Sequence, residues 1–282
     1  MMNLKDYQNL FLPAVEKEMQ KIIKVNLGKF NGLLQEMLTY HFGWGIRSKN
    51  KKAKGKRIRP LLALLCTEGA GESWEKALPS ATAVELIHNF SLIHDDIKDK
   101  GNIRRGRETI WKRWGTAQAI NAGDTMYLLA YKTMLGLRST CTKEVTIKAT
   151  SLLCDTFLHL TYGQYLDISF ESQRTITLDD YWQMVEGKTA ALLGCSTKFG
   201  ALISSRKKVE QDKYYQFGYL IGMAFKVYGD WLGMWGQPEK VGKSTISGLV
   251  QGKKTLPVLL GMRNSKIFTE RWRKDNIIIQ EA

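Results

Sequence analysis

Three aspartates and two arginines lie close together in the segment IHNFSLIHDDIKDKGNIRRG, residues 87–106. Seven residues of a helix return to nearly the same direction, so we expect His88 and Asp95 on one face, two turns apart. Asp99 follows Asp95 at i+4, and Asp96 lies beside them. Two carboxylates at this spacing repel each other on a bare helix. A divalent cation between them makes the pair favourable, and oxygen ligands from one helix suit Mg²⁺, which completes its shell with waters and substrate phosphates.

Two adjacent arginines follow these acids along the chain. Arg104 and Arg105 would supply fixed cations and bidentate hydrogen-bond donors for phosphate groups. The alternative is a solvated helix end that happens to carry acids. The acids follow a run of apolar residues rather than a polar face, which favours a site that binds Mg²⁺ and phosphate groups.

The rest of the sequence predicts helices to position these residues. The chain has five prolines, each near an apparent segment boundary. Between them, apolar residues recur at three- and four-residue spacing, as in ALPSATAVELIHNF and INAGDTMYLLAYKTMLGL. Strand-like alternation between glycine turns is nearly absent. We therefore predict one all-α domain over residues 1–282.

The net charge of +15 points to an anionic partner. Part of it lies in RSKNKKAKGKRIRP, where residues 47–55 form a basic loop. Such a run could bind nucleic acid, an anionic membrane surface or phosphates, or it could be a solvated loop. Since no nucleic-acid-binding motif and no basic-aromatic interleaving occur, we expect no nucleic acid partner. A polyanionic small substrate explains the charge better.

The cysteines and the hydropathy pattern indicate a cytoplasmic protein. No apolar run approaches the roughly 18 residues needed to cross a bilayer, and the N-terminal segment lacks the apolar stretch of a signal peptide. The four cysteines are scattered without CxxC spacing, so we expect reduced thiols rather than disulfides or a zinc site.

Seven motifs in this order give the chain a family resemblance. They are GKRIRP, ELIHNFSLIHDDIKD, IRRGRETIWKRWG, AGD, GQYLDI, EGKTAALLG and GKKTLP, and they cover about residues 50–260. In this register the chain resembles the trans-type polyprenyl (isoprenyl) diphosphate synthases. The resemblance implies an all-α, isoprenoid-synthase-type helical bundle around a central cavity that holds Mg²⁺ and two diphosphates. Members of that family join an allylic diphosphate to isopentenyl diphosphate, usually as homodimers.

The resemblance also implies a role for individual residues. Asp95 and Asp99, with Asp96 in support, match the first aspartate-rich motif, which holds Mg²⁺ against the allylic diphosphate. Arg104 matches a contact to the same diphosphate, and Gln164 matches a position that lines the cavity. The isopentenyl diphosphate pocket is matched by Lys56, Arg59, His88 and Arg105. Further groups around the allylic diphosphate are matched by Lys188, Thr189 and Lys253.

The expected reaction explains these residue types. Ionisation of the allylic C–O bond builds negative charge on the leaving diphosphate and leaves a carbocation. Metal ions and fixed Lys and Arg groups stabilise the diphosphate, and an apolar cavity protects the carbocation from water. The isopentenyl double bond then attacks and a proton is lost. No side-chain nucleophile is needed, and no serine or cysteine triad pattern occurs.

The second aspartate-rich motif departs from the family pattern. Where the family reads like FQxxDDxLG, this chain reads FKVYGDWLG, so that Lys226 replaces glutamine, Gly229 replaces the first aspartate, and Asp230 is retained as a candidate metal ligand. Gly248 stands where the family has a later aspartate. Two acids are lost and one lysine is gained. Our hypothesis is that Lys226 contacts the diphosphate directly and partly replaces a missing cation.

The glycines of this region, at 218, 222, 229 and 233, fall at helical spacing and indicate either close packing or a loosened helix.

The segment after TLPVLLG also differs from the family. The family normally continues through further helices, whereas this sequence ends at RWRKDNIIIQEA. We expect a cavity that is less well closed, or a cover supplied by a partner chain.

Three functions remain open at this point. The first is a homodimeric prenyltransferase that makes a linear isoprenyl diphosphate, with an activity that the altered second motif could reduce. The second is a catalytically impaired subunit in a heterodimer with another synthase. The third is a terpene synthase of the same fold, which would ionise a prenyl diphosphate without an acceptor. The intact isopentenyl diphosphate set favours the first.

Overall fold

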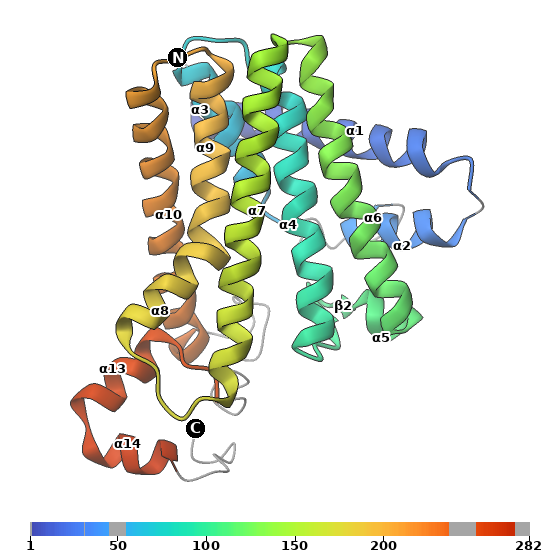
Figure 1. Ribbon diagram of the computed structural model, residues 1–282. Coiled ribbons are helices and arrows are strands. Elements are labelled where there is room, and N and C mark those ends of the chain that lie inside the picture. The colour runs from blue at the N-terminus through green and yellow to red at the C-terminus, as the bar shows by residue number, and fades with distance from the viewer. Residues whose placement is uncertain (1, 31, 45–54, 237–251, 274–282) are drawn as a thin grey trace. The chain divides into compact units, whose positions relative to one another are not determined.

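The computed structural model describes residues 2–30, 32–44, 55–236 and 252–273. These residues are helical almost throughout, which confirms the all-α prediction (Figure 1). Within the described part of the chain the strands are β1 (Ile103–Arg104) and β2 (Arg107–Glu108), which pair antiparallel as a short hairpin. Most of the basic loop and the segment that contains Gly248 lie outside the described residues. In the described ranges, no helix combines the length and the apolar character needed to cross a membrane.

The chain divides into two compact units, which are described separately. The first contains residues 1–155 and 195–218, and the second contains residues 156–194 and 219–282. Three long helices, α7 (Lys143–Ser172), α9 (Ala191–Ile203) and α10 (Lys208–Trp235), contribute residues to both units. That residues 1–282 form a single domain stays a prediction.

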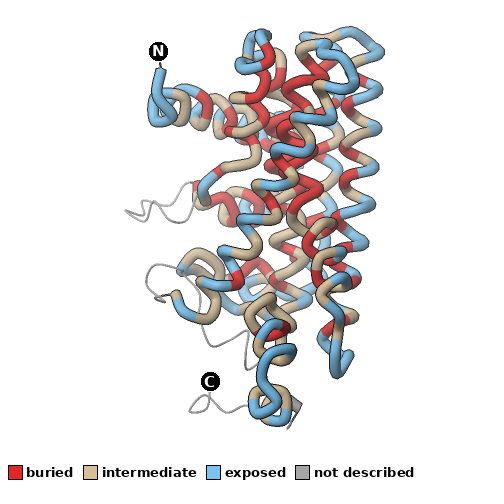
Figure 2. The backbone as a smooth tube through the Cα atoms, turned by 90° about the vertical axis from the view of Figure 1, so that its left-hand side faces the viewer, coloured by how far each residue is buried: buried red, intermediate tan, exposed pale blue. Residues whose placement is uncertain are grey.

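The first unit is built around α4 (Leu78–Lys98), which packs against α6 (Thr116–Met134) and α3 (Ile58–Gly69) (Figure 1). On α1 (Leu4–Leu27) the buried residues Phe11, Val15, Met19 and Ile23 recur every fourth position, so the helix packs by one apolar stripe. Buried and exposed residues interleave along the helices in Figure 2, as expected for this kind of packing. The unit also contains α2 (Leu33–Phe42), η2 (Trp74–Ala77), the β-hairpin, α5 (Ile110–Trp114) and η3 (Leu135–Ser139).

Helix α4 positions the first acidic motif. It begins with a proline in its first turn and runs through a mostly buried stretch that also takes the polar side chains of Glu85 and Asn89 into the interior. It ends at Lys98, with Asp99 as its C-cap residue, and the chain then enters the hairpin. Arg105 takes the left-handed conformation at the hairpin turn, with φ +53°. The aspartates and arginines of residues 87–106 therefore lie at one end of α4.

The second unit holds the later motifs. Its core consists of Leu166, Phe170, Tyr181, Met184, Val185 and Leu259. Helix α8 (Leu178–Val185) begins with a capping box between Thr177 and Asp180. It leads through η4 (Glu186–Ala190), one turn of π-helix, into α9. After α10, the described chain resumes at Gly252 and forms α13 (Leu256–Asn264) and α14 (Lys266–Arg273).

Candidate functional site

Asp95 and Asp99 occupy the last turn of α4, as the spacing predicts. Both side chains are partly buried, and the amide of Asp99 donates to the carbonyl of Asp95 at 2.8 Å, so the helical register holds as far as Asp99. The two carboxylates thus belong to one helical turn, as an i, i+4 pair.

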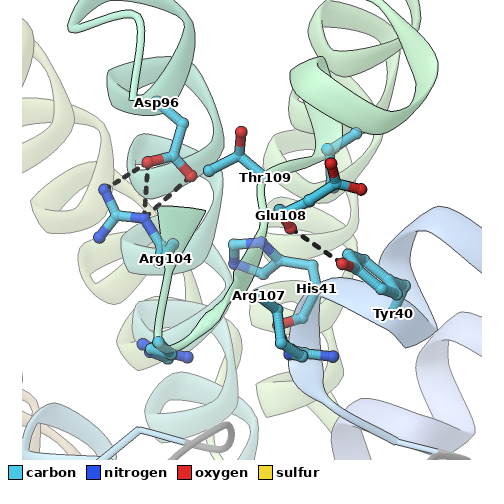
Figure 3. A pocket seen from close by; sticks show the side chains of 9 residues that line it. Tyr40, His41, Asp96, Arg104, Arg107, Glu108 and Thr109 are labelled. Atoms are coloured by element: carbon cyan, nitrogen blue, oxygen red, sulfur yellow. Dashed lines mark hydrogen bonds and ion pairs between the residues drawn. The ribbon is translucent and has the colours of Figure 1, made fainter. Parts of the chain in front are cut away.

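Asp96 has a different role from its neighbours. Its buried carboxylate accepts from Nε of Arg104 at 2.7 and 2.9 Å, and from Nη2 at 2.7 Å (Figure 3). The two residues were predicted as a motif acid and a phosphate contact. The structure brings them together as a bidentate ion pair between α4 and β1.

Arg57 anchors the segment that carries the predicted isopentenyl diphosphate residues. Its side chain is 3% exposed, and it bonds Glu16 at 2.7 Å and Glu85 at 2.8 Å. The guanidinium also lies 5.3 Å from the ring centroid of Phe42. The backbone of Arg57 is in the left-handed region, with φ +49°, so the chain turns at this residue, between Lys56 and Ile58. The sequence analysis did not single out Arg57, although an arginine between two predicted phosphate-binding residues is a usable signal.

The predicted pocket residues Arg59, His88 and Arg105 lie near this anchor. Burial lowers the pKa of Arg59, although Glu85 opposes the shift. Burial, and then the positive charge of Arg57, lowers the pKa of Arg105 to about 10. Burial and the charge of Arg59 hold the pKa of His88 well below its usual range. Cations that are buried close to one another mark a place where an anion would be stabilised.

Two further observations concern the surroundings of these residues. A Cβ atom added to Gly55 would lie 2.7 Å from Nη2 of Arg105, so Arg105 lies against the GKR segment. Lys56 follows Gly55 and is exposed. The Nε atom of Arg59 is buried and has no hydrogen-bond partner among the residues that the structure describes. A buried donor of this kind requires an acceptor, which a bound phosphate group would provide.

A small pocket lies beside the Asp96–Arg104 pair (Figure 3). His41 in its wall is hydrogen-bonded to Asn89 at 3.2 Å, and burial followed by the charge of Arg105 holds its pKa well below the usual value. The guanidinium of Arg107 lies 4.7 Å from the ring centroid of Tyr40. Nothing in the sequence pattern indicated His41 or Arg107, because their surroundings come from distant parts of the chain. The residues that line the pocket are Tyr40, His41, Asp96, Arg104, Arg105, Arg107, Glu108, Thr109 and Ile110.

The second unit positions Gln164 and Lys188 through a close backbone contact. A Cβ atom at Gly163 would lie 2.2 Å from the amide nitrogen of Lys188, and one at Gly187 would lie 2.6 Å from the carbonyl oxygen of His159. Only glycines permit the π-turn η4 to press against α7 in this way, and single π-turns often occur at functional sites. The Nε2 atom of Gln164 is buried without a hydrogen-bond partner among the described residues. Thr189, next in the turn, is partly buried.

Two predicted lysines of this unit face carboxylates. Lys188 bonds Asp167 at 2.5 Å, and Lys253 lies 4.0 Å from Glu171. Burial raises the pKa of Asp167, but the charges of Lys188, Lys253 and Lys226 outweigh it and hold that pKa below its ordinary value. The three lysines therefore act on one carboxylate, which indicates that they gather in one part of the unit.

Lys226 and Asp230 form an ion pair one turn apart on α10. The carboxylate of Asp230 also accepts from the hydroxyl of Tyr181 at 2.8 Å and from the amide of Leu256 at 3.1 Å. Asp230 thus joins α10 to α8 and to the start of α13.

The two acidic motifs differ in how well they suit a divalent cation. At the first, Asp95 and Asp99 provide oxygen ligands of the kind that Mg²⁺ prefers, while Arg104 takes up Asp96. At the second, Asp230 already accepts from three donors, one of them an ammonium group, and Gly229 brings no ligand. The residues of the second motif do not fit a metal ion. Across the described residues, no three acidic, histidine or cysteine side chains are grouped closely enough to hold a metal by themselves.

Comparison with known proteins identifies the class of protein. The fold is a helical bundle of the isoprenoid-synthase type. The polyprenyl synthetase family pattern matches residues 45–280, and the chain belongs to this family. It is 40% identical over 228 residues to a (2E,6E)-farnesyl diphosphate synthase of Mycobacterium bovis, covering 80% of this chain and 62% of that protein. It is 39% identical over 207 residues to a geranylgeranyl diphosphate synthase of Methanosarcina mazei, covering 73% and 63%.

Solved structures show the same fold. A polyprenyl synthetase from Streptomyces coelicolor A3(2) aligns with a TM-score of 0.88 and 32% identity, over 99% of this chain and 82% of that one. A geranylgeranyl pyrophosphate synthetase from Pyrococcus horikoshii Ot3 aligns with a TM-score of 0.80 and 32% identity, over 95% and 80%. The predicted family and fold are confirmed. The chain spans less than two thirds of the length of the curated relatives named above.

Proposed function

We propose that this protein is a trans-prenyltransferase that condenses an allylic diphosphate with isopentenyl diphosphate to give a linear isoprenyl diphosphate. The observation that carries the proposal is the group of arginines around Arg57. Arg57 bonds Glu16 and Glu85 and Arg104 bonds Asp96, while burial lowers the pKa of Arg59, Arg105 and Arg107. A group of partly desolvated guanidinium groups favours a polyanionic ligand.

Within this proposal, Lys56, Arg59, His88 and Arg105 bind the isopentenyl diphosphate. The buried, unpartnered Nε of Arg59 supports the assignment, in the part of the chain that the structure describes. His88 binds as a neutral imidazole because burial and Arg59 keep its pKa low. An acceptor pocket of this kind also favours condensation over the cyclisation of a single prenyl diphosphate, which needs no isopentenyl group.

Asp95 and Asp99 are the residues that we assign to Mg²⁺, with Asp96 and Arg104 as the pair that supports them. When bound, Mg²⁺ would stabilise negative charge on the leaving diphosphate of the allylic substrate. From the family resemblance we assign Lys188, Thr189 and Lys253 to the same diphosphate, and the positive charge of the two lysines favours it as a leaving group. Gln164 supplies a buried donor that has no partner among the described residues.

The proposed reaction balances without a protein nucleophile. The allylic C–O bond breaks, and its electron pair leaves with the diphosphate. The isopentenyl double bond then forms the new C–C bond, and the released diphosphate takes the proton that restores a double bond. The protein binds both substrates, orients them and excludes water.

The relatives' printed names, farnesyl and geranylgeranyl diphosphate synthase, support chain elongation. A homodimer, or a heterodimer with another synthase subunit, stays a prediction from the family resemblance. A cytoplasmic location stays a prediction from the cysteine spacing of the sequence.

The test is an incubation of the purified protein with Mg²⁺, allylic diphosphates of several lengths and labelled isopentenyl diphosphate. Label in a longer diphosphate is the expected result. Arg59→Gln should raise KM for isopentenyl diphosphate about 10-fold or more, since a hydrogen bond to a charged group contributes about 1.5–3 kcal/mol. A matched control is Arg138→Gln in η3, which changes the same residue type away from the site.

Other outcomes would overturn the proposal. A hydrocarbon or an alcohol formed without the acceptor would identify a terpene synthase. No turnover by the pure protein, together with co-purification of an active synthase, would identify a non-catalytic subunit.

A further inference from the structure

The Lys226–Asp230 pair occupies the remnant of the second acidic motif. The Nζ atom of Lys226 contacts Oδ1 of Asp230, and the two side chains are 24% and 7% exposed. Tyr181 and the Leu256 amide both donate to Oδ2. Both oxygens of the one acid left in this motif are therefore engaged by protein donors.

Lack of space does not explain why an aspartate is missing at position 229. Gly229 is exposed, and no heavy atom lies within 4 Å of a Cβ atom built on it. An aspartate would fit there without displacing neighbours. The chain nevertheless carries glycine at this position and an ammonium group three residues earlier, a combination that repels a divalent cation.

Further lysines of the same unit lie near this motif. Lys188 and Lys253 act on Asp167 together with Lys226, and Lys254 donates to the carbonyl of Glu171 at 3.1 Å. The side chains of Lys188, Lys226 and Lys253 are 22%, 24% and 27% exposed, so each side chain is partly open to solvent.

We propose that the second motif of this chain is a metal-free subsite for a diphosphate, in which the ammonium group of Lys226 stands in for the divalent cation. Asp230 holds Lys226 in place and fixes the start of α13 through the Leu256 amide, so it is a positioning residue and not a metal ligand. The inference rests on the proposed function for the identity of the anion. It adds that this enzyme binds diphosphate through fewer metal ions than an enzyme with two complete acidic motifs.

The first test measures binding of inorganic pyrophosphate to the full chain in EDTA by calorimetry. Wild type should bind, Lys226→Gln should bind at least about 10-fold more weakly, and Lys226→Arg should recover most of the affinity because it retains the charge. Lys213→Gln, an exposed position earlier on α10, is the matched control and should leave binding unchanged. Unchanged affinity in Lys226→Gln would overturn the proposal.

The second test counts Mn²⁺ ions by electron paramagnetic resonance in the presence of pyrophosphate. Replacing Asp95 and Asp99 together by asparagine should remove all pyrophosphate-dependent Mn²⁺, since the second motif binds none. Lys226→Gln/Gly229→Asp should gain at least one ion per chain over wild type. Pyrophosphate-dependent Mn²⁺ binding that persists in the Asp95/Asp99 variant would contradict the inference. This test does not depend on whether a Lys226 variant folds.

These measurements separate the two proposals. If pyrophosphate binding depends on Lys226 but labelled isopentenyl diphosphate is not turned over, the subsite proposal stands and the prenyltransferase proposal is rejected. If the label is turned over but Lys226 does not affect pyrophosphate binding, the prenyltransferase proposal stands and the subsite proposal is rejected.

Discussion

The guanidinium of Arg104 holds both carboxylate oxygens of Asp96, with N···O distances of 2.7 to 2.9 Å. This pair divides the three aspartates of the first motif into two kinds. Asp96 ties α4 to β1 from a buried position, whereas Asp95 and Asp99 lie in the final helical turn as the acids that suit a cation.

The first prediction separates these roles. Asp95→Asn and Asp99→Asn should each lower kcat by about 10²–10³-fold, the usual cost of removing one preorganised electrostatic group. Their free energy of unfolding should stay near that of wild type, because each change removes one of two like charges at i, i+4. Asp96→Asn should instead lower the free energy of unfolding by about 2 kcal/mol, since it weakens a partly buried, charge-assisted pair. Urea unfolding and Mg²⁺-dependent turnover would measure both effects.

The control for this series is Asp155→Asn, an exposed position on α7. It should change neither quantity. A stable, active Asp95→Asn variant would remove the basis for the magnesium assignment.

A second prediction concerns the Arg57 anchor. Arg57→Met should destabilise the protein by about 3–5 kcal/mol, because it leaves Glu85, which is 2% exposed, without its buried counter-charge. Arg57→Met/Glu85→Gln should recover part of this loss by removing the uncompensated charge. If Arg57 also positions its neighbours Lys56 and Arg59, the double variant should keep a raised KM for isopentenyl diphosphate while kcat changes little. A KM that returns to the wild-type value would limit Arg57 to a structural role.

A third prediction uses two glycines of α10 that the sequence pattern could not distinguish. A Cβ atom at Gly222 would lie 2.6 Å from Cα of Ala190, whereas one at Gly233 meets nothing within 4 Å. Gly222→Ala should therefore destabilise the protein, by about 1–3 kcal/mol for an overpacked contact. Gly233→Ala should stabilise it by up to about 1 kcal/mol through helix propensity. Equal effects in thermal unfolding would show that the contact at Gly222 can relax.

The helices, and the motif residues that lie on one helix, could be predicted from the sequence because both depend on local patterns. The i, i+4 relation of Asp95 and Asp99 follows from helical periodicity alone, and the apolar stripes predict which helix faces are buried. The family resemblance extended this to the fold.

The contacts between distant segments could not be predicted in this way. Arg57 finds its partners on α1 and α4, 41 and 28 residues away, and Asp96 meets Arg104 only because the chain turns back after α4. Gly222 and Gly233 have the same helical spacing but different tertiary neighbours. The Lys226–Asp230 ion pair has a local i, i+4 spacing, but the sequence analysis assigned Lys226 to the diphosphate and Asp230 to a metal instead of pairing them.

The last prediction concerns pH. Burial is the first cause that lowers the pKa of His41, His88 and His94, so these side chains are neutral in the folded protein at pH 7. In the unfolded chain a histidine has a pKa of about 6.5, so below that pH the unfolded state binds more protons than the folded state. Stability is therefore fully present above about pH 6.5 and falls as the pH is lowered, by at most about 1.4 kcal/mol per pH unit for each histidine that stays neutral. Urea unfolding between pH 7.5 and 5 should show this decline, and His88→Gln should reduce its slope by one histidine's share. A decline of the same slope in His88→Gln would mean that His88 takes up its proton in the folded protein, which contradicts its assignment as a neutral group beside Arg59.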